Sequence, residues 1–171
     1  MRDIVLYEIR KSIEEINELE LSPSDIIDGD QSEQEQLLVD TVRKLIDLSY
    51  VARKEGLLAL EEKAGVLPDT NGYDTLKMLL MLIVDGTDPD LVEEMALMKY
   101  FASGMKGYRA LQHLIMMIGV ADIQAGANPR VFEEKIILAL PKHLAEAERR
   151  RLKDDSHGEV DIKERIMGMW R

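Results

Sequence analysis

The chain has 171 residues, which suits a single domain, and its 46% hydrophobic and 32% charged residues are ordinary for a soluble globular protein. The formal net charge of −11 disfavours nucleic acid and anionic membrane surfaces as partners, because an acidic surface repels both. The chain contains no cysteine, so disulfides and thiolate metal sites are excluded, and this fits the reducing cytoplasm where we expect the protein to reside.

No segment has the length and composition of a membrane helix. Residues 1–15 are charged throughout and lack the apolar stretch of a signal peptide. The longest unbroken apolar run, residues 114–121, lies between His113 and Asp122, whereas a spanning helix needs about 20 apolar residues. We therefore expect a protein that does not insert into membranes.

The first predicted element is an amphipathic helix over residues 3–20. Apolar residues recur there at helical spacing, with charged residues between them: Ile9, Ile13, Ile16 and Leu19. A polar loop follows, in which Ser22 and Pro23 predict the start of a short helical turn. Residues 1–35 thus supply an N-terminal helix and a loop.

A long helix is predicted over about residues 32–63. Its buried side is marked by apolar residues at helical spacing: Leu38, Val42, Leu45, Ile46, Ala52 and Leu60. Gly56 lies inside this segment, where it costs up to about 1 kcal/mol relative to alanine. A glycine in this position indicates a bend.

Helical periodicity continues to residue 153. We predict helices over about 73–84, from Pro89 towards Ala125 with three glycines loosening the pattern, over 129–140 and over 141–153. No segment alternates as a strand does, and no fixed-period repeat is evident.

The predicted fold class is therefore all-α, a compact bundle of about five to seven helices. Residues 1–153 form one helical domain, and residues 154–171 form a C-terminal tail with room for a short helix from Val160.

The acidic stretch VDGTDPDLVEE, residues 84–94, has the order of a helix start. Asp88 precedes Pro89; a proline in the first helical position loses no hydrogen bond, and the aspartate accepts from free N–H groups. A calcium loop would need oxygen ligands at alternate positions, then glycine and a later glutamate, and this order is absent. We predict a capped helix here and a second one at 128–130.

Residues with catalytic or metal-binding potential are sparse. None of His113, His143 and His157 has a glutamate three positions before it, as a carboxylate-bridged metal bundle requires. His113 is predicted to be a satisfied, partly buried residue. The sequence has no glycine-rich phosphate loop, nucleophile elbow or redox pair. We expect no catalytic residue, metal or cofactor, and so a protein that is not an enzyme.

Two further features each have two interpretations. Met95, Met98, Met105, Met116 and Met117 gather in one segment, where methionine either fills the core, which we favour, or lines an adaptable groove. The basic run 148–153 is either a solvated helix end, which suits the helix dipole and is favoured, or a nucleic-acid contact.

Three blocks of sequence resemble the cytoplasmic parts of a known family. ARKEGLLALEE (52–62) and LIVDGTDPDLVEE (82–94) resemble the large cytoplasmic loop of the flagellar stator subunits in the MotA/TolQ/ExbB proton-channel family. GVADIQAGANPRVFEEKIILALP (119–141) resembles the segment that follows the last membrane helix of those subunits. The blocks keep the family order over residues 36–141.

The chain departs from that family in its membrane helices. The family has two before the first block and two between the second and third. Here the amphipathic stretch 1–20 and a loop replace the first pair, and the second pair is absent. The resemblance therefore implies the cytosolic parts without proton conduction, since those helices and a partner subunit build the channel.

The resemblance also implies a set of partner-binding charges. Two charged residues of the first block contact the rotor switch protein in that family, and they correspond to Arg53 and Glu61 here. On one helix these two would lie about 12 Å apart, with no opposite charge three or four residues away. The alternative interpretation is that both are ordinary solvated helix charges.

Arg130 and Glu134 are the corresponding charges of the third block, where a local ion pair between them is the other interpretation. We expect a non-enzymatic interaction module that binds the flagellar rotor switch protein or the stator and modulates motility. The alternative is a self-associating helical scaffold or adaptor unrelated to flagella, with a homo-oligomer as its state.

Overall fold

A computed structural model describes residues 2–20 and 28–157 of the chain. The predicted turn near Ser22 and the predicted short helix from Val160 lie outside these residues. Everything the structure describes is helix or connecting loop, which confirms the all-α class.

The described residues form eight α-helices and one short 3-10 helix, slightly more than the five to seven expected. They are α1 (Arg2–Glu20), α2 (Asp28–Glu55), the 3-10 helix η1 (Leu57–Ala59), α3 (Leu60–Gly65), α4 (Tyr73–Val84), α5 (Pro89–Ser103), α6 (Gly107–Gln124), α7 (Pro129–Ile137) and α8 (Lys142–His157).

The additional helices arise where glycine ends a helix that the apolar pattern alone would continue. The long helix predicted over 32–63 begins earlier, at Asp28, and ends at Glu55, because Gly56 adopts a φ of +86° and turns the chain into η1 and α3. The single run predicted from Pro89 is divided in the same way. Gly104, with a φ of +63°, closes α5 in the left-handed conformation before α6 begins.

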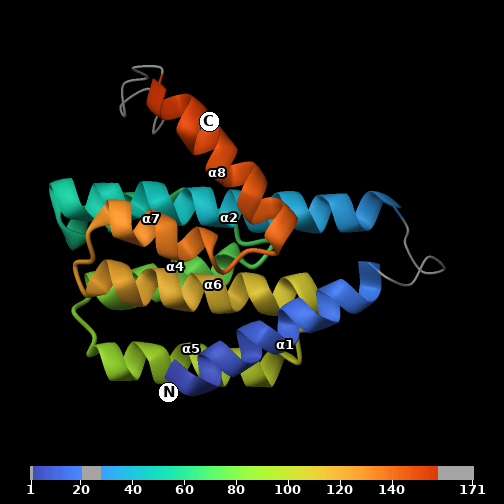
Figure 1. The fold of residues 1–171 in the computed structure, drawn as a ribbon. Coiled ribbons are helices and arrows are strands. Elements are labelled where there is room, and N and C mark those ends of the chain that lie inside the picture. Colours follow the sequence, from blue (N-terminus) through green and yellow to red (C-terminus); the bar gives the residue numbers. More distant parts are fainter. Residues whose placement is uncertain (1, 21–27, 158–171) are drawn as a thin grey trace.

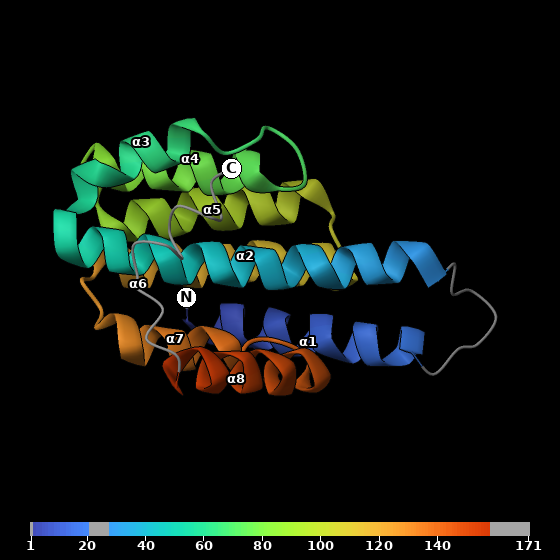
Figure 2. The ribbon, with the colours of Figure 1, turned by 90° about the horizontal axis from the view of Figure 1, so that it is seen from above.

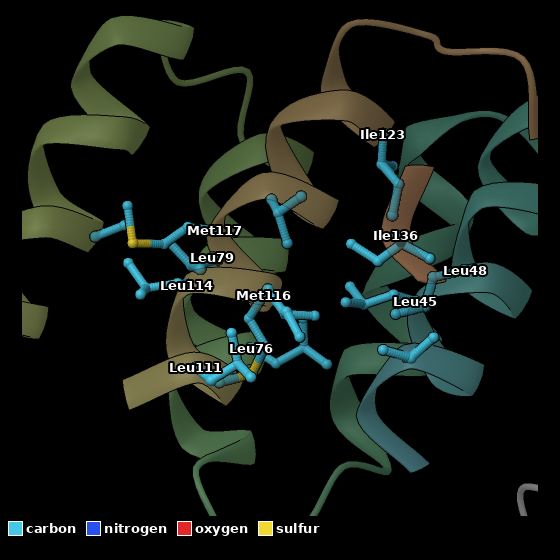
Figure 3. Close-up of a cluster of buried hydrophobic side chains, with 14 of the residues drawn as sticks. Leu45, Leu48, Leu76, Leu79, Leu111, Leu114, Met116, Met117, Ile123 and Ile136 are labelled. Carbon is cyan, nitrogen blue, oxygen red and sulfur yellow. The ribbon is translucent and has the colours of Figure 1, made fainter. Parts of the chain in front are cut away.

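Helix α6 is the centre of the bundle (Figure 1). It contacts α1, α2, α4, α5 and α7, and 13 of its 18 residues are buried, which explains why its sequence is apolar on every side. Figure 3 shows side chains of the neighbouring helices meeting those of α6, among them Leu45 of α2, Leu79 of α4 and Ile136 of α7. The apolar run 114–121 is therefore a buried core helix.

The crossing of α6 and α2 depends on a residue without a side chain. A Cβ atom built on Gly119 would lie 2.8 Å from both Cδ atoms of Leu45, which is itself fully buried. The glycine thus permits an approach of the two helices that alanine would obstruct.

The junctions between α4 and α5 and between α6 and α7 have the same design, 40 residues apart from Gly86 to Gly126. The two glycines have φ values of +73° and +69°. Asp88 and Asn128 then accept a hydrogen bond from the second following N–H, each at 3.0 Å, with a proline between donor and acceptor. Both predicted caps are confirmed.

The similarity extends into the packing. Residues 40 positions apart near the two junctions are buried in both: Ile83 and Ile123, Val92 and Phe132, and Ala96 and Ile136. Near the junctions, identical residues at this spacing are confined to one short stretch, too short to show as a repeat in the sequence: Ile83 and Ile123, Gly86 and Gly126, Pro89 and Pro129, and Glu93-Glu94 and Glu133-Glu134. The two junctions are also joined, since the Gln124 side chain donates to the Thr87 carbonyl at 2.7 Å.

Candidate protein-interaction surface

The two charges predicted from the first block do not share one helix. Arg53 is exposed in the last turn of α2, and Glu61 is exposed in the first turn of α3. Because Gly56 turns the chain between them, the expected axial separation of about 12 Å along one helix is wrong. The two side chains instead belong to successive helices.

The charges of the third block lie at the same end of the bundle as Arg53. Helix α7 begins beside the last turns of α2, where the Tyr50 hydroxyl donates to a carboxylate oxygen of Glu133 at 3.4 Å. Seen from above in Figure 2, α3 lies on one side of α2 and α7 on the other. The end of α2 thus stands between the helix that carries Glu61 and the helix that carries Arg130.

The expected ion pair between Arg130 and Glu134 is absent from the described part of the chain. Lys135, one residue further along, pairs instead with both oxygens of Asp122 at 2.7 and 2.8 Å, and this links α7 to α6. Arg130 and Glu134 are left exposed on α7.

We define the α2-end surface as Arg53, Glu61, Arg130 and Glu134. All four are exposed, and within residues 2–20 and 28–157 none of their side chains takes part in a hydrogen bond or an ion pair. The bundle therefore presents four charges that the fold itself does not use. Charges of this kind can read a complementary pattern on a partner.

His113 is more deeply buried than the sequence suggested. It is 1% exposed, its Nε2 lies 3.0 Å from the Ala96 carbonyl oxygen, and its ring lies 5.6 Å from that of Tyr100. Nε2 therefore donates, and the buried Nδ1 has no hydrogen-bond partner among the residues that the structure describes. Burial lowers the pKa of His113 below its ordinary value of 6.5, against a smaller opposing effect of the Ala96 carbonyl.

The depressed pKa of His113 predicts a loss of stability in mild acid. Above pH 7 the imidazole is neutral in both states. As the pH falls through 6.5 the unfolded chain binds a proton more readily than the folded protein does, so the free energy of unfolding should fall steadily as the pH is lowered. Urea titrations of the wild type and of His113→Gln at each pH measure it. An equal fall in both proteins would contradict the assignment.

The sequence analysis missed a buried ionic cluster that attaches α8. Glu148 is 3% exposed and accepts from Arg43 of α2 at 2.5 and 3.1 Å and from Arg151 at 2.9 Å. Burial raises the pKa of Glu148, but the hydrogen bonds from the two arginines outweigh it, so the pKa lies below its ordinary value. The basic run 148–153 thus helps to hold the fold together. In the sequence, the only sign of this cluster was a single glutamate followed by three arginines.

Some of the methionines fill the core, and others lie on the surface where a partner could contact them. Met116 and Met117 are buried in the core on α6, as core filler would be (Figure 3). Met95 and Met98 of α5 are exposed, at 36% and 62%. Exposed methionines on a helix whose other face is buried indicate a contact surface more than a filled core.

A small pocket of about 210 Å³ lies between α1 and the connection from α5 to α6. Its carboxylates already serve the fold, since Glu8 accepts from the Tyr100 hydroxyl at 3.0 Å and Glu15 from the Gly107 N–H at 3.1 Å. Burial and the neighbouring Glu8 raise the pKa of Tyr100 to about 12. Tyr100 is therefore a poor acid or base near neutrality, and the pocket has no evident catalytic arrangement.

The fold and this surface define an all-α bundle with an exposed charged end. Comparison of the chain with protein-family models, with curated proteins and with solved structures finds no match. Across the described ranges, none of the helices combines the length and the apolar character needed to traverse a lipid bilayer.

Proposed function

We propose that this chain is a non-enzymatic protein-interaction module that binds its partner through the α2-end surface. The observation that carries the proposal is that all four charges of this surface are exposed and outside the ion pairs of the described fold. An exposed helix charge can pair with a neighbour three or four residues away, as Arg10 does with Glu14. The charges of the α2-end surface are not engaged in this way.

The three blocks that resemble the stator subunits suggest which partner this is. Two of the surface residues, Arg53 and Glu61, lie in the first block, and Arg130 and Glu134 lie in the third. The partner we propose is therefore the flagellar rotor switch protein or the stator, and the module modulates motility from the cytoplasm. Opposite charges on one surface suit a partner with an alternating charge pattern, and they set orientation and association rate more than affinity.

Reversing the charge of Arg53 tests the proposal. For Arg53→Glu we expect the affinity for the C-terminal domain of the switch protein to fall by about tenfold, since each charge pair at an exposed rim contributes on the order of 1 kcal/mol. Isothermal titration calorimetry at low salt measures it. The matched control is Lys142→Glu, an exposed charge at the start of α8, which should leave binding unchanged.

A wild-type protein with no affinity for the switch protein or the stator would refute this partner. If the wild type and Arg53→Glu bind with equal affinity, the partner is right but the α2-end surface is not its binding site. The second candidate function is a self-associating scaffold, and the exposed apolar face of α5 favours it.

A further inference from the structure

Helix α5 carries apolar residues on both of its faces. The inward face packs into the core through Val92, Ala96, Leu97 and Tyr100. The outward face is also apolar, with Leu91, Met95, Met98 and Phe101 exposed by 47, 36, 62 and 58%. Large apolar side chains gathered on the exposed face of a surface helix indicate a face that a partner covers.

The exposed residues form a continuous stripe. Leu91, Met95 and Met98 are spaced by four and three residues and therefore share one face of the helix, and Phe101 follows three residues later. Helix α5 lies along one edge of the bundle (Figure 1). The rings of the buried Tyr100 and the exposed Phe101 pack with their centroids 5.2 Å apart. We call these four residues the α5 stripe.

The corresponding face of α7 shows what an uncovered helix looks like in this fold. Val131 and Leu138, which match Leu91 and Met98 at the 40-residue spacing, are also exposed. Between them, however, Lys135 takes the place of Met95 and pairs with Asp122. The face on α7 thus carries two adjacent charges, Glu134 and Lys135, whereas the face on α5 carries only Glu94 and keeps Met95 beside it.

The charges of α5 indicate what covers the stripe. Acidic residues occupy its N-terminal half, and lysines occupy its C-terminal end and the following loop: Asp88, Asp90, Glu93 and Glu94 against Lys99 and Lys106. A second α5 helix running antiparallel would place each acidic half against a basic end and would oppose the two helix dipoles.

The stripe is also complementary to itself in the antiparallel register. A twofold axis between Met95 and Met98 sets Met95 of one helix against Met98 of the other, and Leu91 against Phe101. Side chains of similar size thus meet across one symmetric contact, as an isologous interface requires. Lys99 lies beside this contact and pairs with Asp74 of α4 at 2.8 Å.

We propose that two copies of this chain associate through the α5 stripe, antiparallel about an axis between Met95 and Met98. The contact is separate from the α2-end surface, so the dimer stands or falls independently of the proposed partner. Its two copies would present two α2-end surfaces, which would strengthen binding to a repetitive target without any new contact.

Sedimentation equilibrium of the full chain tests the dimer. From about 1 to 500 µM the wild type should pass from monomer to dimer, as a modest helix-mediated interface does. Met98→Glu, which sets a charge in the stripe, should weaken association at least tenfold. The matched control is Leu138→Glu at the equivalent position of α7, which should associate like the wild type, and circular dichroism shows whether each variant is folded.

Cysteine cross-linking tests the register, because the chain has no cysteine of its own. Met95→Cys and Met98→Cys are mixed and oxidised, and the mixed disulfide should form several-fold faster than either homodimer. If Met95→Cys and Met98→Cys each cross-link faster with themselves than with each other, the antiparallel arrangement is overturned. A wild type that stays monomeric at 500 µM, or an equal loss of association in Leu138→Glu, would overturn the α5 stripe as the dimer contact.

Discussion

Replacing Gly119 by leucine should lower the free energy of unfolding by about 3 kcal/mol, the upper end of what overpacking costs. The first side-chain atom would already lie 2.8 Å from the methyl groups of Leu45, closer than such atoms approach in proteins. Leu45 cannot move into solvent because it is fully buried between α2 and α6. The two helices would therefore have to separate, and the packing along the whole crossing would be lost.

Two further variants show whether the effect belongs to this crossing. Gly65→Leu adds the same side chain to a helical glycine with no atom near its Cβ position, and it should change stability by less than about 1 kcal/mol. Combining Gly119→Leu with Leu45→Ala returns space at the crossing, so the double variant should be more stable than the sum of the single effects predicts. Urea denaturation is measured for the wild type, the double variant and three single variants, Gly119→Leu, Leu45→Ala and Gly65→Leu. Strict additivity of the Gly119 and Leu45 effects would contradict a direct contact.

Replacing Glu148 by alanine should lower the free energy of unfolding by about 2 to 3 kcal/mol, and α8 should be the first helix to loosen. Breaking a fully buried ion pair costs about 3 to 5 kcal/mol, but Arg43 and Arg151 keep 28 and 31% of their side chains exposed, so water compensates part of the loss. Helix α8 extends away from the bundle (Figure 1). Its main contacts among the described helices are with α2 and α7. Hydrogen exchange should therefore accelerate in α8 before it does in the core.

The contribution of Glu148 also has a defined pH dependence. Its pKa is lowered in the folded state, so the stabilisation is complete above its ordinary value of 4.5 and is lost as the pH falls through the folded-state pKa. The control is Arg10→Ala, which breaks an exposed pair on α1 and should leave stability essentially unchanged. If Glu148→Ala behaves like Arg10→Ala, the cluster does not hold α8 in place.

Much of the fold was predictable from the sequence because its signals are local. Apolar residues at helical spacing predicted α1 and α4 closely, and Asp88-Pro89 and Asn128-Pro129 predicted the starts of α5 and α7. Caps and turns depend on a few neighbouring backbone groups, so a short stretch of sequence contains the information needed. The exposure of Arg53, Glu61, Arg130 and Glu134 was also expected, since charged side chains are rarely buried without a partner.

Other features depend on residues far apart in the chain, and only the tertiary structure decided them. Glu148 meets Arg43 across 105 positions of sequence, and Gly119 matters only because Leu45 lies against it. The division of the methionines between core and surface was equally invisible, since Met98 and Met116 differ in their neighbours and not in their own chemistry. Periodicity tells which face of a helix is apolar, whereas the packing of all the helices determines which apolar face remains uncovered.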